Sequence, residues 1–281
     1  MNRSIRDAPR DVPRDRPQFV PPNACDCHVH VFGPASRYPF APDRAYTPPE
    51  ASLEDLLALH KRLGLERVVV VQPSVYGTDN SCTLDAVRTL GNRARAVVVI
   101  DANSRLEEME CVSGVRVNLH TGGIDDSRPI QEAAKRVAPL GWHVQTFARV
   151  SLLKGMQPLP VPLVIDHFGL ASSQSDVDYL ASLLREGNTY VKLSGTHRLP
   201  MDPGPVVRAL VEANPDRCLW GSDWPHPGSG SRDPKVIQPF DRIDDLASLQ
   251  RLRAWVGDEA LFRKILVDNP ARLYDFQGGA S

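Results

Sequence analysis

The chain has 281 residues, a length that suits either two modest domains or one α/β barrel. Its 33 basic and 34 acidic residues give a formal net charge of -1, so we expect a small-molecule partner and no binding to nucleic acid or to an anionic membrane. The five cysteines are scattered, no apolar run approaches the ~18 residues of a membrane span, and the N-terminus lacks a signal peptide's apolar core, so we expect a cytoplasmic location.

Residues 1–22 precede the first predicted strand and are rich in arginine, aspartate and proline. They repeat a four-residue pattern that begins Arg6-Asp7-Ala8-Pro9 and Arg10-Asp11-Val12-Pro13. With so few apolar side chains, this segment cannot offset its ordering entropy by burial. We expect a solvated tail, or an arm lying over the body or a partner subunit, followed by one domain over residues 23–281.

From Ala24 onward, short β-rich apolar runs alternate with amphipathic helical stretches. The pattern predicts eight strands, at residues 24–31, 66–72, 95–101, 114–119, 142–147, 162–167, 189–194 and 217–223. It predicts helices at 52–63, 79–90, 129–140, 175–186 and 205–213. Ser52 is the expected N-cap of the first helix, and Gly64 is its expected end.

Eight strands alternating with helices favour a single-domain α/β fold, the (β/α)8 TIM barrel. The connections after the third and fifth strands, at residues 104–111 and 150–155, leave room only for short or distorted helices. An open doubly wound sheet is the alternative. It is disfavoured because no glycine-rich phosphate loop follows the first strand.

The first strand carries His28 and His30. Residues two apart in a strand face the same way, so the two imidazoles project together. Cys25 and Cys27 have the opposite parity, and we expect them to face away from the histidines. Two adjacent inward imidazoles are costly to bury without a use, which favours a functional role.

Active-site groups of a TIM barrel lie at the carboxyl ends of its strands. At the end of strand eight, Asp223 could be a general base or a metal ligand, or it could cap the following helix. At the end of strand six, Asp166 and His167 face opposite sides in an extended chain, and we expect His167 to face the pocket. Other polar residues at or just past strand ends are Gln72, Ser74, Tyr76, Asn118, Gln145 and Arg198.

Arg116 lies in the otherwise apolar stretch from Val115 to Leu119, so its charge needs an anionic partner. The partner could be a structural carboxylate such as Asp101. It could also be a substrate carboxylate that Arg116 binds in bidentate fashion. The sequence leaves both possibilities open.

Several of these strand ends form longer motifs. They are Asp26-Cys27-His28-Val29-His30-Val31-Phe32-Gly33, Gln72-Pro73-Ser74-Val75-Tyr76-Gly77-Thr78-Asp79-Asn80, Gly114-Val115-Arg116-Val117-Asn118, Trp142-His143-Val144-Gln145, Asp166-His167-Phe168-Gly169, Val191-Lys192-Leu193-Ser194-Gly195, Trp220-Gly221-Ser222-Asp223-Trp224-Pro225-His226 and the closing Asn269-Pro270-Ala271-Arg272-Leu273-Tyr274. Together they resemble the amidohydrolase superfamily, and more narrowly its branch containing 2-pyrone-4,6-dicarboxylate hydrolase and related lactonases. The likeness covers nearly all of residues 24–276.

The resemblance implies a barrel that hydrolyses a lactone, with Asp223 as the base that activates water. It implies that three histidines polarise or position the lactone carbonyl: His28, His30 and His167. The residues that would bind substrate are Arg116 and Arg198 for carboxylates, with Ser74, Tyr46, Tyr76, Asn118 and Gln145 as further candidates.

The chain departs from the pyrone dicarboxylate pattern in two places. The second arginine expected after Arg116 is missing from 119–123, and Phe147 stands where a tyrosine is expected. A lactone with one anionic group or hydroxyls is therefore the expected substrate, such as a sugar-acid lactone or a muconolactone. The alternatives are a lactone isomerase, a metal-dependent decarboxylase of the same superfamily, and a barrel without catalytic activity.

Many amidohydrolases bind divalent metals through such histidines. A two-metal site also needs a bridging carboxylate or carboxylated lysine, and strands four and five offer Arg116, Asn118, Gln145 and Phe147 instead. One Zn²⁺ or Mn²⁺ could be held by His28, His30, His167 and Asp223. Because Arg116 would repel a cation, we favour catalysis without a cofactor. The sequence leaves the choice between monomer and homo-oligomer open.

Overall fold

Eight parallel strands form the centre of the protein, whose computed structural model describes residues 17–228 and 233–276. The strands are β1 (Cys25–Val29), β2 (Arg67–Val71), β3 (Ala94–Val98), β4 (Val112–Asn118), β5 (His143–Phe147), β6 (Leu163–Ile165), β7 (Thr189–Lys192) and β8 (Cys218–Leu219). All eight lie where the sequence predicts them, and most are shorter than predicted because the chain leaves the sheet early at the carboxyl ends.

Each strand pairs with the next one along the chain, in the order β1 to β8. Hydrogen bonds between β1 and the segment after β8 complete the ring: the Asp223 amide donates to the His28 carbonyl (2.9 Å), and the His30 amide donates to the Trp224 carbonyl (2.8 Å). Gly221 permits this approach, because a Cβ at that position would lie 2.6 Å from the Cβ of His28. The prediction of a (β/α)8 barrel is confirmed.

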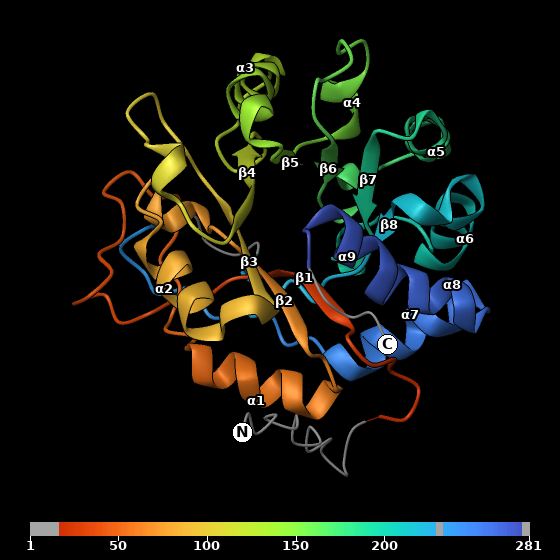
Figure 1. Ribbon diagram of the computed structural model, residues 1–281, viewed down its shortest axis with the longest axis horizontal. Coiled ribbons are helices and arrows are strands. Elements are labelled where there is room, and N and C mark those ends of the chain that lie inside the picture. Colours follow the sequence, from red (N-terminus) through yellow and green to blue (C-terminus); the bar gives the residue numbers. More distant parts are fainter. Residues whose placement is uncertain (1–16, 229–232, 277–281) are drawn as a thin grey trace, which may run out of the picture.

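Helices surround the strands as an outer ring (Figure 1). They are α1 (Leu53–Leu63), α2 (Ser81–Leu90), α3 (Arg128–Val137), α4 (Val150–Leu153), α5 (Gln174–Glu186), α6 (Pro203–Ala213), α7 (Asp245–Val256), α8 (Glu259–Arg263) and α9 (Asn269–Leu273). The short 3₁₀ turns are η1 (Ser74–Tyr76), η2 (Gly91–Arg93), η3 (Leu106–Glu108), η4 (Ala138–Leu140), η5 (His167–Leu170), η6 (Thr196–Arg198) and η7 (Pro215–Arg217), and η8 (Lys264–Asp268) is a π-helix.

Local sequence explains these boundaries well. The Ser52 side chain accepts from the Asp55 amide and the Asp55 carboxylate accepts from the Ser52 amide, a capping box that starts α1. Gly64 ends the helix in the left-handed conformation. After β3 and β5 the chain forms only η3 and the four-residue α4, as the short connections predict.

Apolar side chains form two separate clusters. The outer one fills the space between strands and helices, and it joins Val70 of β2 to Leu56 of α1. The inner one takes the alternate strand residues, such as Val69, and continues to Tyr274 beyond α9. The barrel interior is therefore a packed core with its functional groups at one end.

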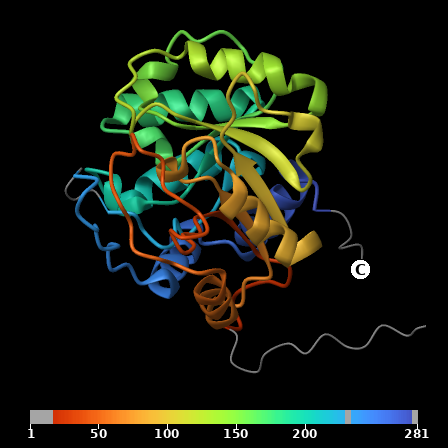
Figure 2. The ribbon, with the colours of Figure 1, turned by 90° about the vertical axis from the view of Figure 1, so that its left-hand side faces the viewer.

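The loop after β1 and the segment after β8 run side by side across the carboxyl ends of the strands (Figure 2). Thr47 and Ile237 form an isolated bridge between them. Both segments thus cover the end of the barrel where the candidate site lies. Among the described residues, the helices lack the length and apolar character needed to cross a membrane.

The predicted tail lies partly outside the described residues, which begin at Pro17. Val20 is buried, and the ring of Phe19 lies 6.3 Å from that of Phe262 in α8. The division between a tail of residues 1–22 and a barrel domain of 23–281 stays a prediction.

Candidate active site

A pocket opens at the carboxyl ends of the strands, and most of the predicted site residues line it. Its walls come from the β1 and β8 segments, from the ends of the intervening strands and from the loop after β1. The lining residues are His30, Ala45, Tyr46, Pro73, Ser74, Arg116, Asn118, His120, Thr121, Phe147, His167, Arg198, Asp223, Pro227, Gly228 and Gln238. We call this the central pocket.

Three imidazoles converge on one carboxylate oxygen at the floor of the central pocket. The Oδ1 atom of Asp223 lies 3.6 Å from His28 Nε2, 3.8 Å from His30 Nε2 and 3.5 Å from His167 Nε2. All four side chains are almost fully buried. The sequence prediction that these residues come together is therefore matched by their placement.

Each ring is oriented through its other nitrogen. His30 Nδ1 lies 2.7 Å from the Val71 carbonyl oxygen, which can only accept, so His30 donates there. His167 Nδ1 bonds the Ser194 hydroxyl at 2.9 Å. These contacts leave the Nε2 atoms directed at Asp223, which is the arrangement that ligands or proton-handling groups require.

His167 lines the central pocket and Asp166 does not, as expected, but the parity argument behind that expectation is wrong because Asp166 also points into the barrel interior. Strand β6 ends at Ile165, and His167 and Phe168 have positive φ values of 50° and 55°. The alternation of side chains holds only while the chain is extended, so this turn brings both residues inward. The Asp166 carboxylate lies below the pocket, with Oδ1 3.1 Å from His28 Nδ1.

The predicted outward position of Cys25 and Cys27 is also wrong. Both thiols belong to the inner apolar cluster, whereas Asp26 faces helix α1 and lies 3.4 Å from His60. The pairing register with β2 shifts between Asp26 and Val29. That irregularity resets the parity, so His28 faces inward like the cysteines that precede it.

The two arginines at the site bind carboxylates of the protein itself. Arg116 Nε lies 3.5 Å from Asp166 Oδ2, so the structural partner is Asp166 and not the suggested Asp101, which is exposed. Arg198 donates to Asp223 Oδ2 at 2.8 Å. Each arginine keeps a buried Nε without a hydrogen bond. Both arginines nevertheless line the central pocket, so a bound anion would meet their positive charge.

The three imidazoles are neutral at neutral pH. Burial and the charge of Lys192 hold the pKa of His28 well below its ordinary value. Burial, followed by the nearby Arg116, lowers the pKa of His30 to about 4. Burial lowers the pKa of His167 to about 4 against the opposing effect of Asp223. They can thus act as metal ligands or as neutral N–H donors.

Asp223 is ionised in this environment. Burial alone would raise its pKa, but His167, Arg198 and the other two imidazoles together hold the pKa well below its ordinary range. Asp223 has a positive φ of 68°, a sparsely populated conformation for a residue with a side chain. The fold holds a charged carboxylate in one fixed position at the end of the barrel.

The remaining predicted contacts divide into two groups. Tyr46, Ser74 and Asn118 line the central pocket, and the Tyr46 hydroxyl pairs with Ser74. Gln145 lies beneath the pocket and donates to Asp166 Oδ2 at 3.1 Å. Tyr76 lies outside it: its hydroxyl accepts from the Gly33 amide, and its ring stacks on Phe40. The structure gives no support to a substrate contact by Tyr76.

Sequence reasoning missed Lys192, a fully buried lysine at the end of β7. Its Nζ donates to Gln145 Oε1 at 2.7 Å and lies 3.4 Å from Asp166 Oδ1. A charge inside an apolar strand drew attention to Arg116, and the same signal was present at Lys192. His120 and Thr121, from the stretch 119–123 that lacks the expected second arginine, also line the pocket.

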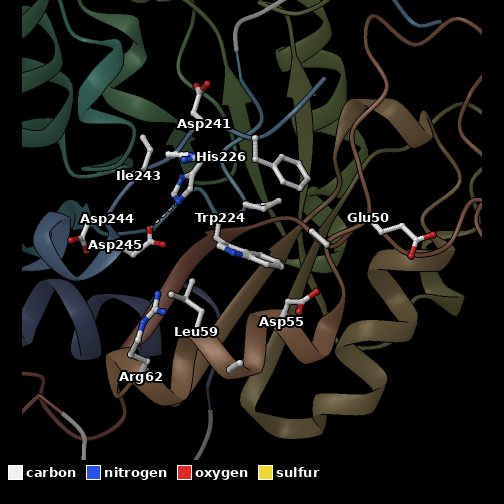
Figure 3. A pocket seen from close by; sticks show the side chains of 15 residues that line it. Glu50, Asp55, Leu59, Arg62, Trp224, His226, Asp241, Ile243, Asp244 and Asp245 are labelled. Atoms are coloured by element: carbon white, nitrogen blue, oxygen red, sulfur yellow. Dashed lines mark ion pairs between the residues drawn. The ribbon is translucent and has the colours of Figure 1, made fainter. Parts of the chain in front are cut away.

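A second hollow lies outside the barrel, between α1 and the segment that leads to α7 (Figure 3). In it, His226 Nε2 lies 3.1 Å from Asp245 Oδ1, and Trp224 separates this pair from Asp55 of α1. None of the three converging imidazoles lines this hollow. We therefore assign the chemistry to the central pocket.

The residues present fit a single divalent metal ion. The Nε2 atoms of His28 and His30 are 3.3 Å apart, and the Asp223 oxygen is 3.5 to 3.8 Å from the three imidazoles. Ligands about 2.0–2.1 Å from a tetrahedral zinc ion are about 3.3 Å from one another. His28, His30 and Asp223 form one of the groups close enough to share an ion.

Comparison with known proteins agrees with this geometry. Residues 25–276 match the family model described as amidohydrolase. A 4-sulfomuconolactone hydrolase from Rhizobium radiobacter is 37% identical over 91% of each chain. A 2-pyrone-4,6-dicarboxylate hydrolase from Comamonas testosteroni is 35% identical over 92% of each chain. A ligand-free crystal structure from Agrobacterium tumefaciens is 27% identical, with a TM-score of 0.77 over 91% of this chain and 96% of that one.

Proposed function

Because the chain belongs to the amidohydrolase family, we propose that it hydrolyses the lactone ring of a small anionic molecule. One observation carries the proposal: the buried, ionised Asp223 carboxylate lies among three neutral imidazoles in a pocket that also holds Arg116 and Arg198. A lactone needs a base for water and donors for the developing oxyanion, and this arrangement supplies both.

The reaction follows from these positions. Asp223 removes a proton from water as the water oxygen attacks the lactone carbonyl carbon. The carbonyl oxygen gains negative charge, and the N–H groups of His28 and His167 stabilise it. The bond from the carbonyl carbon to the ring oxygen then breaks, and protonated Asp223 returns its proton to that oxygen. The products are a carboxylic acid and a hydroxyl group on one molecule.

Substrate binding rests on the two arginines and the polar pocket wall. Arg116 and Arg198 both line the central pocket, and their positive charge suits a carboxylate or a similar anion. His120 and Thr121 line the pocket from the stretch 119–123, which contains no second arginine. A lactone with one anionic group and neighbouring hydroxyls therefore fits better than a dicarboxylated pyrone.

A divalent metal would be held by His28, His30, His167 and Asp223, and when bound it would polarise the lactone carbonyl and acidify a water molecule. Arg116 and Arg198 lie in the same pocket and oppose a cation. We therefore propose catalysis without a metal, in which His28 and His167 act as hydrogen-bond donors. His30 does not donate to the substrate, because its one proton goes to the Val71 carbonyl.

The test is a hydrolysis assay on muconolactones, sugar-acid lactones and pyrone carboxylates, run with the purified protein before and after EDTA treatment. We expect the protein to hydrolyse a monoanionic lactone and to keep this activity after EDTA treatment. Loss of activity in EDTA, restored by zinc or manganese, would overturn the metal-free mechanism and leave lactone hydrolysis standing.

Product analysis separates hydrolysis from the rival activities. In H₂¹⁸O, hydrolysis places ¹⁸O in the product acid, whereas an isomerase that moves the acyl group to another hydroxyl does not. A decarboxylase would release CO₂. Either of those outcomes, or no turnover of any lactone in the panel, would contradict the proposal.

A further inference from the structure

Lys192 is a buried cation for which the proposed chemistry gives no direct use. Its side chain has no exposed surface, and it is not among the residues that line the central pocket. It donates to Gln145 and lies 3.1 Å from His28 Nδ1. Burying a charge at this place is costly unless the charge has a partner that needs it.

His28 Nδ1 has two neighbours with opposite requirements. Asp166 Oδ1, at 3.1 Å, can bond it only if Nδ1 carries the proton, because a carboxylate accepts. Lys192 Nζ, also at 3.1 Å, can donate to it only if Nδ1 is bare. A neutral imidazole has one N–H, so Nδ1 satisfies one neighbour at a time.

The surroundings of His28 Nε2, on the other side of the imidazole ring, decide which of the two nitrogens carries the proton. His30 gives its Nδ1 proton to the Val71 carbonyl, so His30 Nε2 is bare. His28 Nε2 lies 3.3 Å from that atom. Two bare nitrogens at this distance repel each other, whereas a proton on His28 Nε2 turns the contact into a hydrogen bond. In that arrangement His28 Nδ1 is bare and accepts from Lys192.

Asp166 does not need the His28 proton. Its Oδ2 accepts from Gln145 at 3.1 Å and lies 3.5 Å from Arg116 Nε. Its Oδ1 lies 3.4 Å from Lys192 Nζ. The carboxylate is thus compensated by two cations and an amide even when His28 offers it nothing.

We propose that Lys192 is a positioning residue that keeps the proton of His28 on Nε2, where a bound lactone carbonyl can accept it in place of His30 Nε2. The inference rests on the proposed lactone hydrolysis. If Asp166 held the proton on Nδ1, Nε2 would be a bare metal ligand, the arrangement in which a carboxylate supports a metal-binding histidine. Lys192 therefore biases the site toward hydrogen-bond catalysis and against metal binding.

The test compares the EDTA-treated wild-type protein with Lys192→Met by ¹⁵N NMR of labelled histidine, with His28 assigned from its absence in His28→Gln. We expect the proton on Nε2 in the wild type and on Nδ1 in Lys192→Met. The variant's metal-free kcat should fall about 100-fold with little change in KM, as for a lost oxyanion donor. Its zinc affinity, measured by calorimetry, should rise about tenfold.

Gln145→Leu is the matched control, because it cuts the same buried network without removing a contact to His28. We expect Gln145→Leu to keep the wild-type tautomer, with the His28 proton on Nε2.

Asp166→Asn should also keep the His28 proton on Nε2, because the asparagine amide can donate to His28 Nδ1. We expect this variant to bind zinc more weakly than the wild type. These two variants and the wild type give a result even if Lys192→Met does not fold.

A wild-type His28 protonated on Nδ1, or a Lys192→Met protein with an unchanged tautomer, would overturn the inference. A shift to Nδ1 in Gln145→Leu would show that the network acts through packing and would overturn it as well. The expected tautomers in a protein that opens no lactone would instead contradict the proposed function and leave the proton placement intact.

Discussion

His28 pairs with Asp166 inside the barrel, and His226 pairs with Asp245 at the start of α7. Both pairs are buried, and in each the imidazole nitrogen lies 3.1 Å from the carboxylate oxygen. Burial and Lys192 hold the pKa of His28 well below its ordinary value. Burial also lowers the pKa of His226, but the carboxylate of Asp245 outweighs it, and the pKa is raised. The distance within the pair therefore does not decide the direction of the shift: deeper burial and the added cation Lys192 lower the pKa of His28, whereas carboxylates alone surround His226 and raise its pKa.

The two pairs also act on different parts of the same segment. His28 faces the Asp223 side chain, whereas the His226 amide donates to the Asp223 carbonyl at 2.8 Å. The Asp241 amide in turn donates to the His226 carbonyl at 2.9 Å. The pair inside the barrel therefore belongs to the chemistry, and His226 of the second pair holds the backbone that presents Asp223.

The largest effect on activity is expected from Asp223→Asn. This change leaves both histidine–aspartate pairs in place and removes the carboxylate that acts as the base. We expect kcat for lactone hydrolysis to fall by about 10³-fold or more, because an amide cannot take a proton from water. Circular dichroism and thermal unfolding should report an intact fold. Turnover close to that of the wild type would contradict the mechanism.

Removing the carboxylate should destabilise the protein more in the His28–Asp166 pair than in the His226–Asp245 pair. Asp166→Leu leaves Lys192 and Arg116 buried without their shared counter-charge, and we expect it to lower the free energy of unfolding by about 3–5 kcal/mol. Asp245→Leu should cost less, because His226 can lose its proton. Urea unfolding of both variants measures the difference, and equal losses would show that the two pairs are equivalent.

The smallest effect is expected from His226→Gln, and it depends on pH. The pKa of His226 is raised by Asp245 and, further away, by Asp223 and Asp26. Its contribution is therefore fully present below the unfolded-state pKa of about 6.5 and is lost as pH rises through the higher folded-state value.

We expect His226→Gln to be less stable than the wild type by about 1–2 kcal/mol at acidic pH, with the gap closing in alkaline solution. Urea unfolding across that pH range measures it. A gap that is constant with pH, or that widens as pH rises, would mean that His226 is not charged in the folded protein.

The sequence predicted the barrel because its signals are local. Valine-rich runs such as Arg67–Val71 and the cap at Ser52 specify elements without reference to the rest of the chain. The convergence of His28, His167 and Asp223 was also predictable, because parallel strands bring their carboxyl ends to one edge.

The failures share a different physical cause, which is departure from ideal geometry. Parity reasoning assumed a regular β1 and an extended chain through His167, and a register shift and a positive φ broke those assumptions. The partner of Arg116 and the role of Lys192 depend on contacts across the barrel. Nothing in one strand's sequence states which residue of another strand will face it.

The seam between β1 and the segment after β8 joins closure of the barrel to assembly of the active site. The backbone bonds that complete the ring are made by Asp223, His28, His30 and Trp224, so closure of this seam also assembles the reactive groups. A chain that has paired its eight strands in order and left this seam open has no assembled centre. Return of turnover after dilution from denaturant therefore reports complete closure, and a delay behind the recovery of helical signal would time the final seam.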